Sequence, residues 1–240
     1  MRAIILAAGR GERMRPLTDH TPKPLLNVRG QPLIVWHIQA LAAAGVRDIV
    51  INCAWLAEQF PAQLGDGSRY GVRLHYSDEQ RDHGRALETA GGIAKALPLL
   101  CADGDDAFWV LSGDVFLPGL ALDVQAAQDF AASERLAHLW LVPNQPHHPR
   151  GDFGISAEGL ALSGDAVSPR YTWSCVGLFR RALFDGVPPD QPQPLRPCLE
   201  RGIGAQRISA SLYPGEWADV GTPERLAAAQ RGSDAGPAAG

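Results

Sequence analysis

Glycines and cationic side chains alternate near the start of the chain, in a pattern suited to binding a polyphosphate. The residues concerned follow a short apolar run and are Gly9, Gly11, Arg13, Arg15 and Lys23. Glycine has no Cβ and tolerates positive φ, so the backbone N–H groups of this loop can approach anionic oxygens closely. Arginine offers phosphate a planar fork of donors, and lysine offers a compact charge. The segment therefore predicts a binding site for a nucleoside triphosphate.

Two other phosphate-binding motifs fit the sequence poorly. A dinucleotide fingerprint requires G-x-G-x-x-G, but Met14 stands at the third glycine position and Pro16 interrupts any helix that would follow. The chain contains no G-x-x-x-x-G-K-[ST] string, which the phosphate loop of many ATPases and kinases needs. A nicotinamide oxidoreductase is therefore a remote alternative, and it would bind a dinucleotide tightly without releasing pyrophosphate.

Two aspartates far apart in the sequence are candidates for binding Mg²⁺. Asp114 closely follows an apolar run at 108–111, which places it at the carboxyl end of a predicted buried strand. Asp219 lies in the segment 216–223, beside a predicted helix start. Mg²⁺ prefers hard oxygen ligands and needs only one or two carboxylates besides waters and substrate phosphates. We therefore expect Asp114 and Asp219 to hold magnesium.

One ordered set of strings resembles the sugar-phosphate nucleotidyltransferases, which join a nucleoside triphosphate and a sugar 1-phosphate into a nucleotide sugar. The strings are L-A-A-G-x-G-x-R-M-x-P-L-T at 6–18 and P-K-P-L at 22–25. The resemblance implies that Arg13, Lys23 and Asp114 are catalytic, and it supports Asp114 with Asp219 as the magnesium ligands. It assigns nucleotide contacts to Ala8, Gly9, Gly11, Glu12, Arg13, Lys23, Glu88, Gly91 and Ser112.

Two further segments give candidate contacts to the base and the sugar. Residues 88–92 read E-T-A-G-G, where family members often carry E-T-G-G-G, and the family uses this loop at the base and sugar. The string H-H-x-x-G-D-F at 147–153 is similar to the branch of the family that transfers a uridylyl group to N-acetylmuramate 1-phosphate. By that likeness Glu88 and Asp152 contact the sugar. Arg29 is either a further contact at the sugar phosphate or a surface arginine.

The resemblance implies an in-line attack of the sugar 1-phosphate oxygen on the α-phosphorus of UTP, forming UDP-N-acetylmuramate and pyrophosphate. The attacking phosphate is already ionised, so the reaction needs neither a general base nor a covalent intermediate. The same core fits GTP with mannose 1-phosphate, dTTP with glucose 1-phosphate, or CTP with phosphocholine. Outside this class, a nucleotide-sugar sensor without catalytic activity is the alternative, since a fold does not fix function.

Length and composition are ordinary for one enzyme domain. The chain of 240 residues is long for a single domain but within the range of α/β folds, and its net charge of −4 offers no basic face for nucleic acid. No stretch is apolar enough to span a membrane, and the first apolar run is too short for a signal peptide, so we expect a cytoplasmic protein. The 4 cysteines lack metal-binding spacing and are expected to be reduced. For the assembly we expect a monomer or a weak homodimer.

Apolar runs and helical patterns alternate along the first half of the chain, which predicts an α/β fold with a mostly parallel, doubly wound, Rossmann-like sheet. Strands are expected near 3–8, 48–52, 72–76 and 108–111, and helices at 32–44, 55–64 and after Gly92. A strand at 136–142 and short extended pieces at 153–162 make the second half mixed, giving a GT-A-like whole. A last helix is expected from Thr222, within one domain over 1–232 that is followed by a flexible tail over 233–240.

Overall fold

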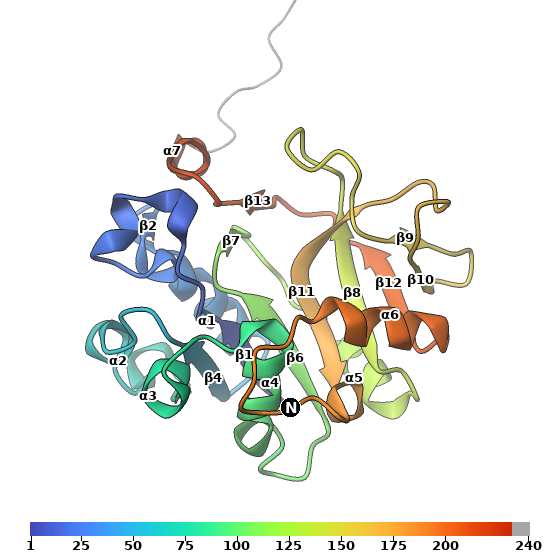
Figure 1. Ribbon diagram of the computed structural model, residues 1–240, viewed down its shortest axis with the longest axis horizontal. Helices are drawn as coiled ribbons and strands as arrows, with labels where there is room; N and C mark the ends of the chain where they lie inside the picture. Colours follow the sequence, from blue (N-terminus) through green and yellow to red (C-terminus); the bar gives the residue numbers. More distant parts are fainter. Residues whose placement is uncertain (232–240) are drawn as a thin grey trace, which may run out of the picture.

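A seven-stranded sheet runs through the middle of the protein, in the order β12-β8-β11-β6-β1-β4-β5 (Figure 1). The computed structural model describes residues 1–231, so the tail expected over 233–240 lies outside the described residues. The strands of this sheet are β1 (Arg2–Leu6), β4 (Asp48–Cys53), β5 (Arg73–Asp78), β6 (Ala107–Ser112), β8 (Ala137–Val142), β11 (Thr172–Arg180) and β12 (Ile208–Leu212). All neighbours pair in parallel except β11, which runs antiparallel to both β6 and β8. The predicted α/β fold with a mostly parallel, mixed sheet is confirmed.

Helices cover both faces of this sheet, and three short strand pairs lie outside it (Figure 1). The helices are α1 (Leu33–Ala43), α2 (Gln59–Leu64), α3 (Glu79–His83), α4 (Glu88–Leu100), α5 (Val124–Ala132), α6 (Arg196–Gly204) and α7 (Pro223–Arg231). The short pairs are β2 (Asn27–Val28) with β3 (Gln31–Pro32), β7 (Val115–Phe116) with β13 (Ala218–Asp219), and β9 (Gly154–Ile155) with β10 (Ala161–Leu162). Within residues 1–231, no helix combines the length and the apolar character needed to cross a bilayer.

Alternation along the central strands builds a separate core on each face of the sheet. Ile5 and Trp109 pack on one face with residues of α1, α2 and α5, whereas Ile4 and Phe108 pack on the other with residues of α4 and α6. Strands buried on both faces read as continuous apolar runs, which is why the periodicity located them. Such burial holds the carboxyl ends of β1 and β6 side by side and rigid.

Two helix starts differ from the expectation. The predicted loop over 88–92 is helical, because α4 already begins at Glu88. A Cβ on Gly92 would lie 2.5 Å from Glu79 Oε1, so glycine serves close packing inside the helix rather than a loop. Residues before α2 are not helical, since Leu56 has a left-handed φ of 47°. At the last helix Thr222 Oγ1 accepts a hydrogen bond from the Arg225 N–H, which confirms Thr222 as its N-cap.

Candidate functional site

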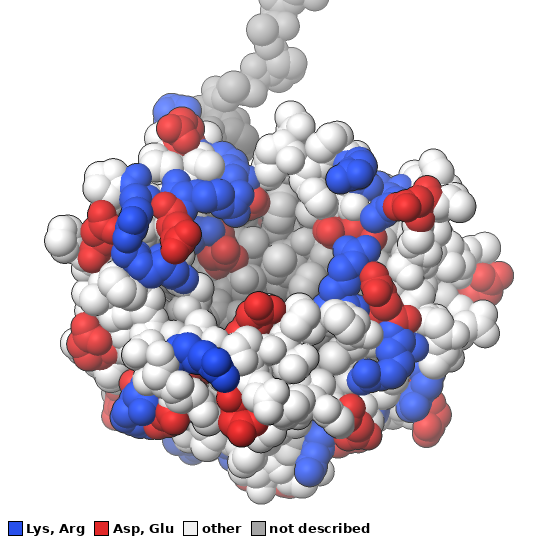
Figure 2. Space-filling model, viewed as in Figure 1, with Lys and Arg blue, Asp and Glu red and all other residues white. Residues whose placement is uncertain are grey.

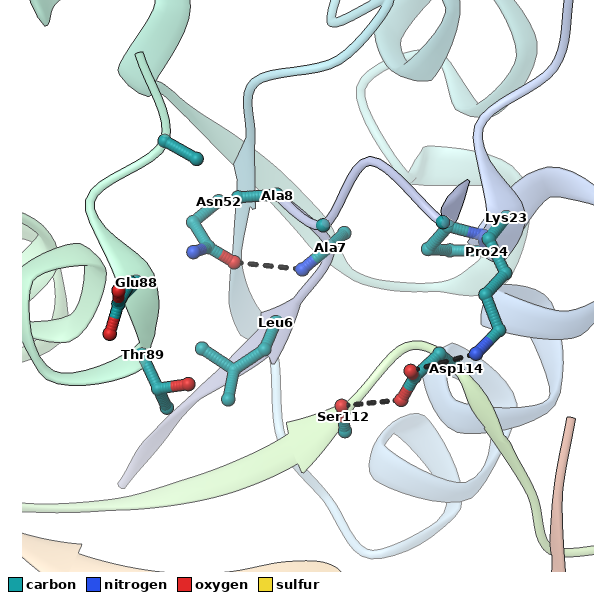
Figure 3. A pocket seen from close by; sticks show the side chains of 13 residues that line it. Leu6, Ala7, Ala8, Lys23, Pro24, Asn52, Glu88, Thr89, Ser112 and Asp114 are labelled. Atoms are coloured by element: carbon teal, nitrogen blue, oxygen red, sulfur yellow. Dashed lines mark hydrogen bonds and ion pairs between the residues drawn. The ribbon is translucent and has the colours of Figure 1, made fainter. Parts of the chain in front are cut away.

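A cavity of about 310 Å³ lies beyond the carboxyl ends of β1 and β6 (Figure 3). Its walls come from the glycine loop after β1, from η3 (Lys23–Leu25), from the end of β6 and from the start of α4. The lining residues are Leu6, Ala7, Ala8, Gly9, Gly11, Lys23, Pro24, Asn52, Ala86, Glu88, Thr89, Ser112 and Asp114. In open α/β sheets ligands bind at this edge, so the position favours a ligand site.

The glycine loop keeps its shape through contacts on the side away from the cavity. Gly11 has a φ of 67°, and a Cβ there would lie 3.1 Å from Thr18 Cγ2. Thr18 Oγ1 donates to the Gly11 carbonyl over 2.8 Å, and Arg10 donates to the Thr18 carbonyl over 2.8 Å. A Cβ on Gly9 would meet nothing within 4 Å among the described atoms, so this part of the loop is open to a ligand.

Lys23, Asp114 and Ser112 form one hydrogen-bonded group at the cavity wall (Figure 3). Lys23 Nζ donates to Asp114 Oδ2 over 2.8 Å, and Ser112 Oγ donates to Asp114 Oδ1 over 2.7 Å. Burial alone would raise the pKa of Asp114, but the charge of Lys23 and both hydrogen bonds hold it below its ordinary value. The Lys23 side chain is only 7% exposed, whereas that of Asp114 is 43% exposed. An ionised carboxylate therefore faces the cavity.

The second predicted metal ligand lies beside the first because β13 pairs with β7. Asp219 stands opposite Val115 in that antiparallel pair, and the Val220 N–H donates to the Asp114 carbonyl over 3.4 Å. The Asp219 carboxylate accepts a hydrogen bond from Arg225, and His147 Nε2 lies 3.3 Å from it. Each carboxylate is thus matched by a cation, Lys23 for Asp114 and Arg225 for Asp219.

This donor set fits a magnesium ion that retains waters and substrate oxygens. Asp114 and Asp219 supply hard carboxylate oxygens from adjacent backbone segments. Across residues 1–231 the structure contains no group of three or more His, Cys, Asp or Glu side chains able to enclose a metal. The described residues therefore offer no site of the kind that encloses a structural zinc ion, but two carboxylates are enough for a magnesium ion that keeps water and substrate ligands.

A buried polar relay that the sequence reading missed joins the two sides of the cavity. Asn52 Oδ1 accepts from the Ala7 N–H over 2.9 Å, and Asn52 Nδ2 donates to Glu79 Oε1 over 2.7 Å. Glu79 Oε2 accepts from the Leu87 N–H over 2.7 Å. Burial raises the pKa of Glu79 above its ordinary value despite these bonds. An asparagine inside the apolar strand at 48–53 was the available signal.

Several predicted nucleotide contacts lie elsewhere in the structure. Glu12 and Arg13 are exposed in the turn that follows the glycine loop, and neither lines the cavity. Gly91 lies inside α4, where its N–H donates to the Gln193 carbonyl over 3.2 Å, so it packs against that segment instead of facing a ligand. Glu88 does line the cavity, with a left-handed φ of 55°.

Arg29 connects the β2–β3 hairpin to the C-terminal part of the described chain. Its guanidinium donates to Glu216 Oε1 over 2.8 Å and to the Ala229 carbonyl over 3.0 Å. The same group lies 4.8 Å from the centre of the Phe116 ring. Arg29 is therefore not a free surface residue but packs at this junction, and a contact with the sugar phosphate stays a prediction.

Asp152 lies in a second cavity of about 360 Å³, formed largely by the loop before β9. Asp152 Oδ2 accepts from the Trp173 N–H over 2.9 Å, and His148 Nε2 lies 3.2 Å from Oδ1. Its neighbour His147 also lines this cavity and contacts Asp219. The second cavity therefore borders the carboxylate pair of the first. Lys and Arg side chains gather on both sides of the hollow in Figure 2.

Cys175 lies at the bulge of β11, near the three carboxylates. The register of β11 against β8 shifts between Trp173 and Val176, and Cys175 within that shift has a φ of 64°. Burial raises the pKa of the Cys175 thiol, and the charges of Asp114, Asp152 and Asp219 raise it further. The thiol is therefore protonated at neutral pH, as expected for a reduced cysteine without a nucleophilic role.

Comparison with known proteins adds three findings. The family profile described as nucleotidyl transferase matches residues 2–167. The chain is 48% identical over 233 residues to an N-acetylmuramate alpha-1-phosphate uridylyltransferase of Neisseria meningitidis serogroup B, covering 96% of this chain and 97% of that protein. It is 35% identical over 240 residues to the protein of that name in Caulobacter vibrioides, covering 95% of each.

The fold has a close match among solved structures. A putative glucose-1-phosphate thymidylyltransferase from Bacillus anthracis, in complex with a sucrose, aligns with a TM-score of 0.81. The alignment covers 96% of this chain and 94% of that one, at 21% sequence identity. At this identity the likeness establishes the fold alone.

Proposed function

The chain belongs to the nucleotidyl transferase family, and on that premise we propose that it transfers a uridylyl group from UTP to N-acetylmuramate 1-phosphate. The products are UDP-N-acetylmuramate and pyrophosphate. The observation that carries the proposal is the Lys23–Asp114 pair, 2.8 Å apart, at the wall of the cavity that also contains the glycine loop. Near full-length similarity to uridylyltransferases supports the choice of base and acceptor. We assign the reaction to peptidoglycan recycling in the cytoplasm.

In this proposal the glycine loop and Lys23 bind the triphosphate. The open side of Gly9 admits phosphate oxygens, and the nearly buried Lys23 ammonium supplies charge in a site shielded from water. Glu88, at the start of α4, and Ser112, at the end of β6, line the same cavity and contact the nucleoside. The exposed Arg13 binds the phosphates that leave as pyrophosphate, outside the cavity.

Asp114 and Asp219 are the residues that would hold Mg²⁺. A bound magnesium ion supplies charge neutralisation at the phosphates. Lys23 and Ser112 orient the Asp114 carboxylate from two directions, and Arg225 fixes that of Asp219. Both carboxylates are therefore preorganised, as catalysis by charge stabilisation requires, and the lowered pKa of Asp114 keeps that carboxylate ionised.

The acceptor needs positioning rather than proton abstraction. Its phosphate is already ionised, so the chain contributes alignment with the α-phosphorus and stabilisation of the charge by Lys23. Asp152 binds the sugar from the second cavity, where the Trp173 N–H and His148 hold its carboxylate. Burial lowers the pKa of His37 to about 4, so this histidine, which lies 2.9 Å from the Val115 carbonyl, is neutral near pH 7, and the reaction does not require it as a base.

Pyrophosphate release from purified protein tests the proposal. N-acetylmuramate 1-phosphate is supplied with UTP, CTP, GTP or dTTP, with Mg²⁺ or with a chelator. We expect release with UTP and Mg²⁺, at least about a hundredfold above the other triphosphates in kcat/KM. Preference for another triphosphate would retain the family and overturn the uridylyl assignment. Binding of UTP without turnover of any acceptor would support the sensor instead.

A further inference from the structure

The second cavity carries more positive charge than its proposed contact with a sugar ring requires. Three arginines line it against two aspartates, and these residues are Arg150, Arg170, Arg196, Asp152 and Asp165. Asp152 accepts from the Trp173 N–H and lies beside His148, and Asp165 is fully exposed, 3.6 Å from Arg170. The cavity thus offers cationic donors to an anion, close to Asp152.

The three arginines differ in how their donors are used. Arg170 is fixed by the carbonyls of Gly151 and Asp152, each accepting over 3.1 Å, so it shapes the cavity wall. Arg196 uses Nε on Glu200 over 2.8 Å and lies 5.7 Å from the Phe153 ring centre. Arg150 is exposed and forms no ion pair with any residue in 1–231. Arg150 and Arg196 therefore retain donors for a ligand.

We propose that this cavity is a carboxylate subsite, in which Arg150 and Arg196 bind the lactyl carboxylate of the acceptor. The inference rests on the proposed function, because N-acetylmuramate differs from N-acetylglucosamine only by a lactyl ether that bears a carboxylate. Arginine suits such a group, since its planar fork pairs with both carboxylate oxygens. His147 joins the cavity to Asp219, so a sugar whose phosphate lies at the aspartate pair has its ring within reach of the arginines.

Binding of the two matched products, UDP-N-acetylmuramate and UDP-N-acetylglucosamine, tests this subsite by calorimetry. The variants are Arg150→Gln and Arg196→Gln, with Arg150→Lys retaining charge. Arg181→Gln is the control, since Arg181 is exposed in the turn that follows β11, away from this cavity. We expect each glutamine variant to weaken UDP-N-acetylmuramate about tenfold to a hundredfold and UDP-N-acetylglucosamine less than about twofold. Arg150→Lys should recover part of the loss, and the control should change neither ligand.

The outcomes separate the subsite from the proposed function. Equal losses for the two ligands, or no loss for either, would overturn the subsite while leaving uridylyl transfer in place. Wild-type protein that binds neither nucleotide sugar would overturn the proposed function and the subsite with it. Thermal unfolding of each variant, expected to match the wild type because both arginines are exposed, excludes misfolding as the cause of a loss.

Discussion

The two cavities hold their polar groups in different ways. Around the glycine loop, side chains at or just beyond strand ends, such as Asn52 and Asp114, are paired with buried neighbours, Asn52 with Glu79 and Asp114 with Lys23. Around Asp152, most lining residues lie in the loop at 147–152, and both Arg150 and Arg196, the latter at the start of α6, are exposed. Rigid strand ends give the precision that phosphoryl chemistry needs, whereas loops accept changes of sequence more readily. On the proposed function, this difference assigns the shared chemistry to the first cavity and the choice of acceptor to the second.

Asp114→Asn should give the largest effect, because it removes a proposed metal ligand from the first cavity. The amide keeps the size of the side chain and an oxygen that accepts from Lys23 or Ser112, so the fold should persist. We expect kcat to fall at least about a thousandfold. Pyrophosphate release and thermal unfolding measure the two quantities, with Asp129→Asn on the exposed face of α5 as the control. A folded variant with normal turnover would contradict the metal assignment.

Asp152→Asn should weaken binding of the acceptor sugar and leave binding of UTP unchanged, which would separate the roles of the two cavities. The remaining oxygen can still accept from the Trp173 N–H, so the loop should stay in place. We expect KM for the sugar 1-phosphate to rise about tenfold or more, with KM for UTP nearly unchanged. Steady-state kinetics with each substrate varied in turn measures both constants. An equal rise in the two would place Asp152 outside the sugar site.

Asn52→Ala should reduce both stability and activity by removing a side chain that holds the wall of the first cavity in place, although Asn52 has no proposed contact with a reacting atom. The change leaves a Glu79 carboxylate oxygen and the Ala7 N–H without their buried partner. We expect the unfolding free energy to fall by about 2–3 kcal/mol, and kcat/KM for UTP to fall about tenfold. Urea unfolding and kinetics measure these changes against Asn27→Ala, an exposed position. Unchanged kinetics in a destabilised protein would limit the relay to a structural role.

The buried side chain of His37 should make the protein less stable at acidic pH. Burial lowers the pKa of His37 from 6.5 to about 4, so the unfolded chain binds the proton more tightly than the folded one. The stability that neutral His37 contributes is fully present above pH 6.5. The unfolding free energy falls progressively as the pH drops toward 4, by about 3 kcal/mol in total.

Urea unfolding of wild type and His37→Gln at pH 7.5 and pH 4.5 measures the difference. The wild type should lose more stability on acidification than the variant, since glutamine does not titrate in this range. Burial also lowers the pKa of His138 to about 4, and that residue titrates equally in both proteins. Equal losses in the two proteins would show that His37 does not titrate as its burial implies.

Local sequence patterns predicted the strands of the central sheet and the residues that directly follow them. Apolar runs located the strands, and the position of Asp114 after such a run indicated its place at the sheet edge, where the structure puts it beside Lys23. The pairing of β7 with β13 joins segments about a hundred residues apart, and no local periodicity encodes such a contact.

The features that the sequence did not predict correctly all depend on how distant segments pack together. Glycine at 91 and 92 predicted a loop, but close contacts with neighbouring segments require glycine there inside a helix. The bond between Asn52 and Glu79 depends on how α3 lies against β4, and the packing of Arg29 on Phe116 depends on the hairpin that carries it. The sequence located several of the residues that line the first cavity, but it did not reveal the neighbours that hold them in place.

A competition between two acceptors tests the account most directly. Purified protein with Mg²⁺ and UTP receives equal concentrations of N-acetylmuramate 1-phosphate and N-acetylglucosamine 1-phosphate, and mass spectrometry measures the ratio of the two nucleotide sugars at early times. That ratio equals the ratio of kcat/KM values. We predict an excess of UDP-N-acetylmuramate of at least about a hundredfold. Equal amounts, or an excess of UDP-N-acetylglucosamine, would contradict the proposed acceptor.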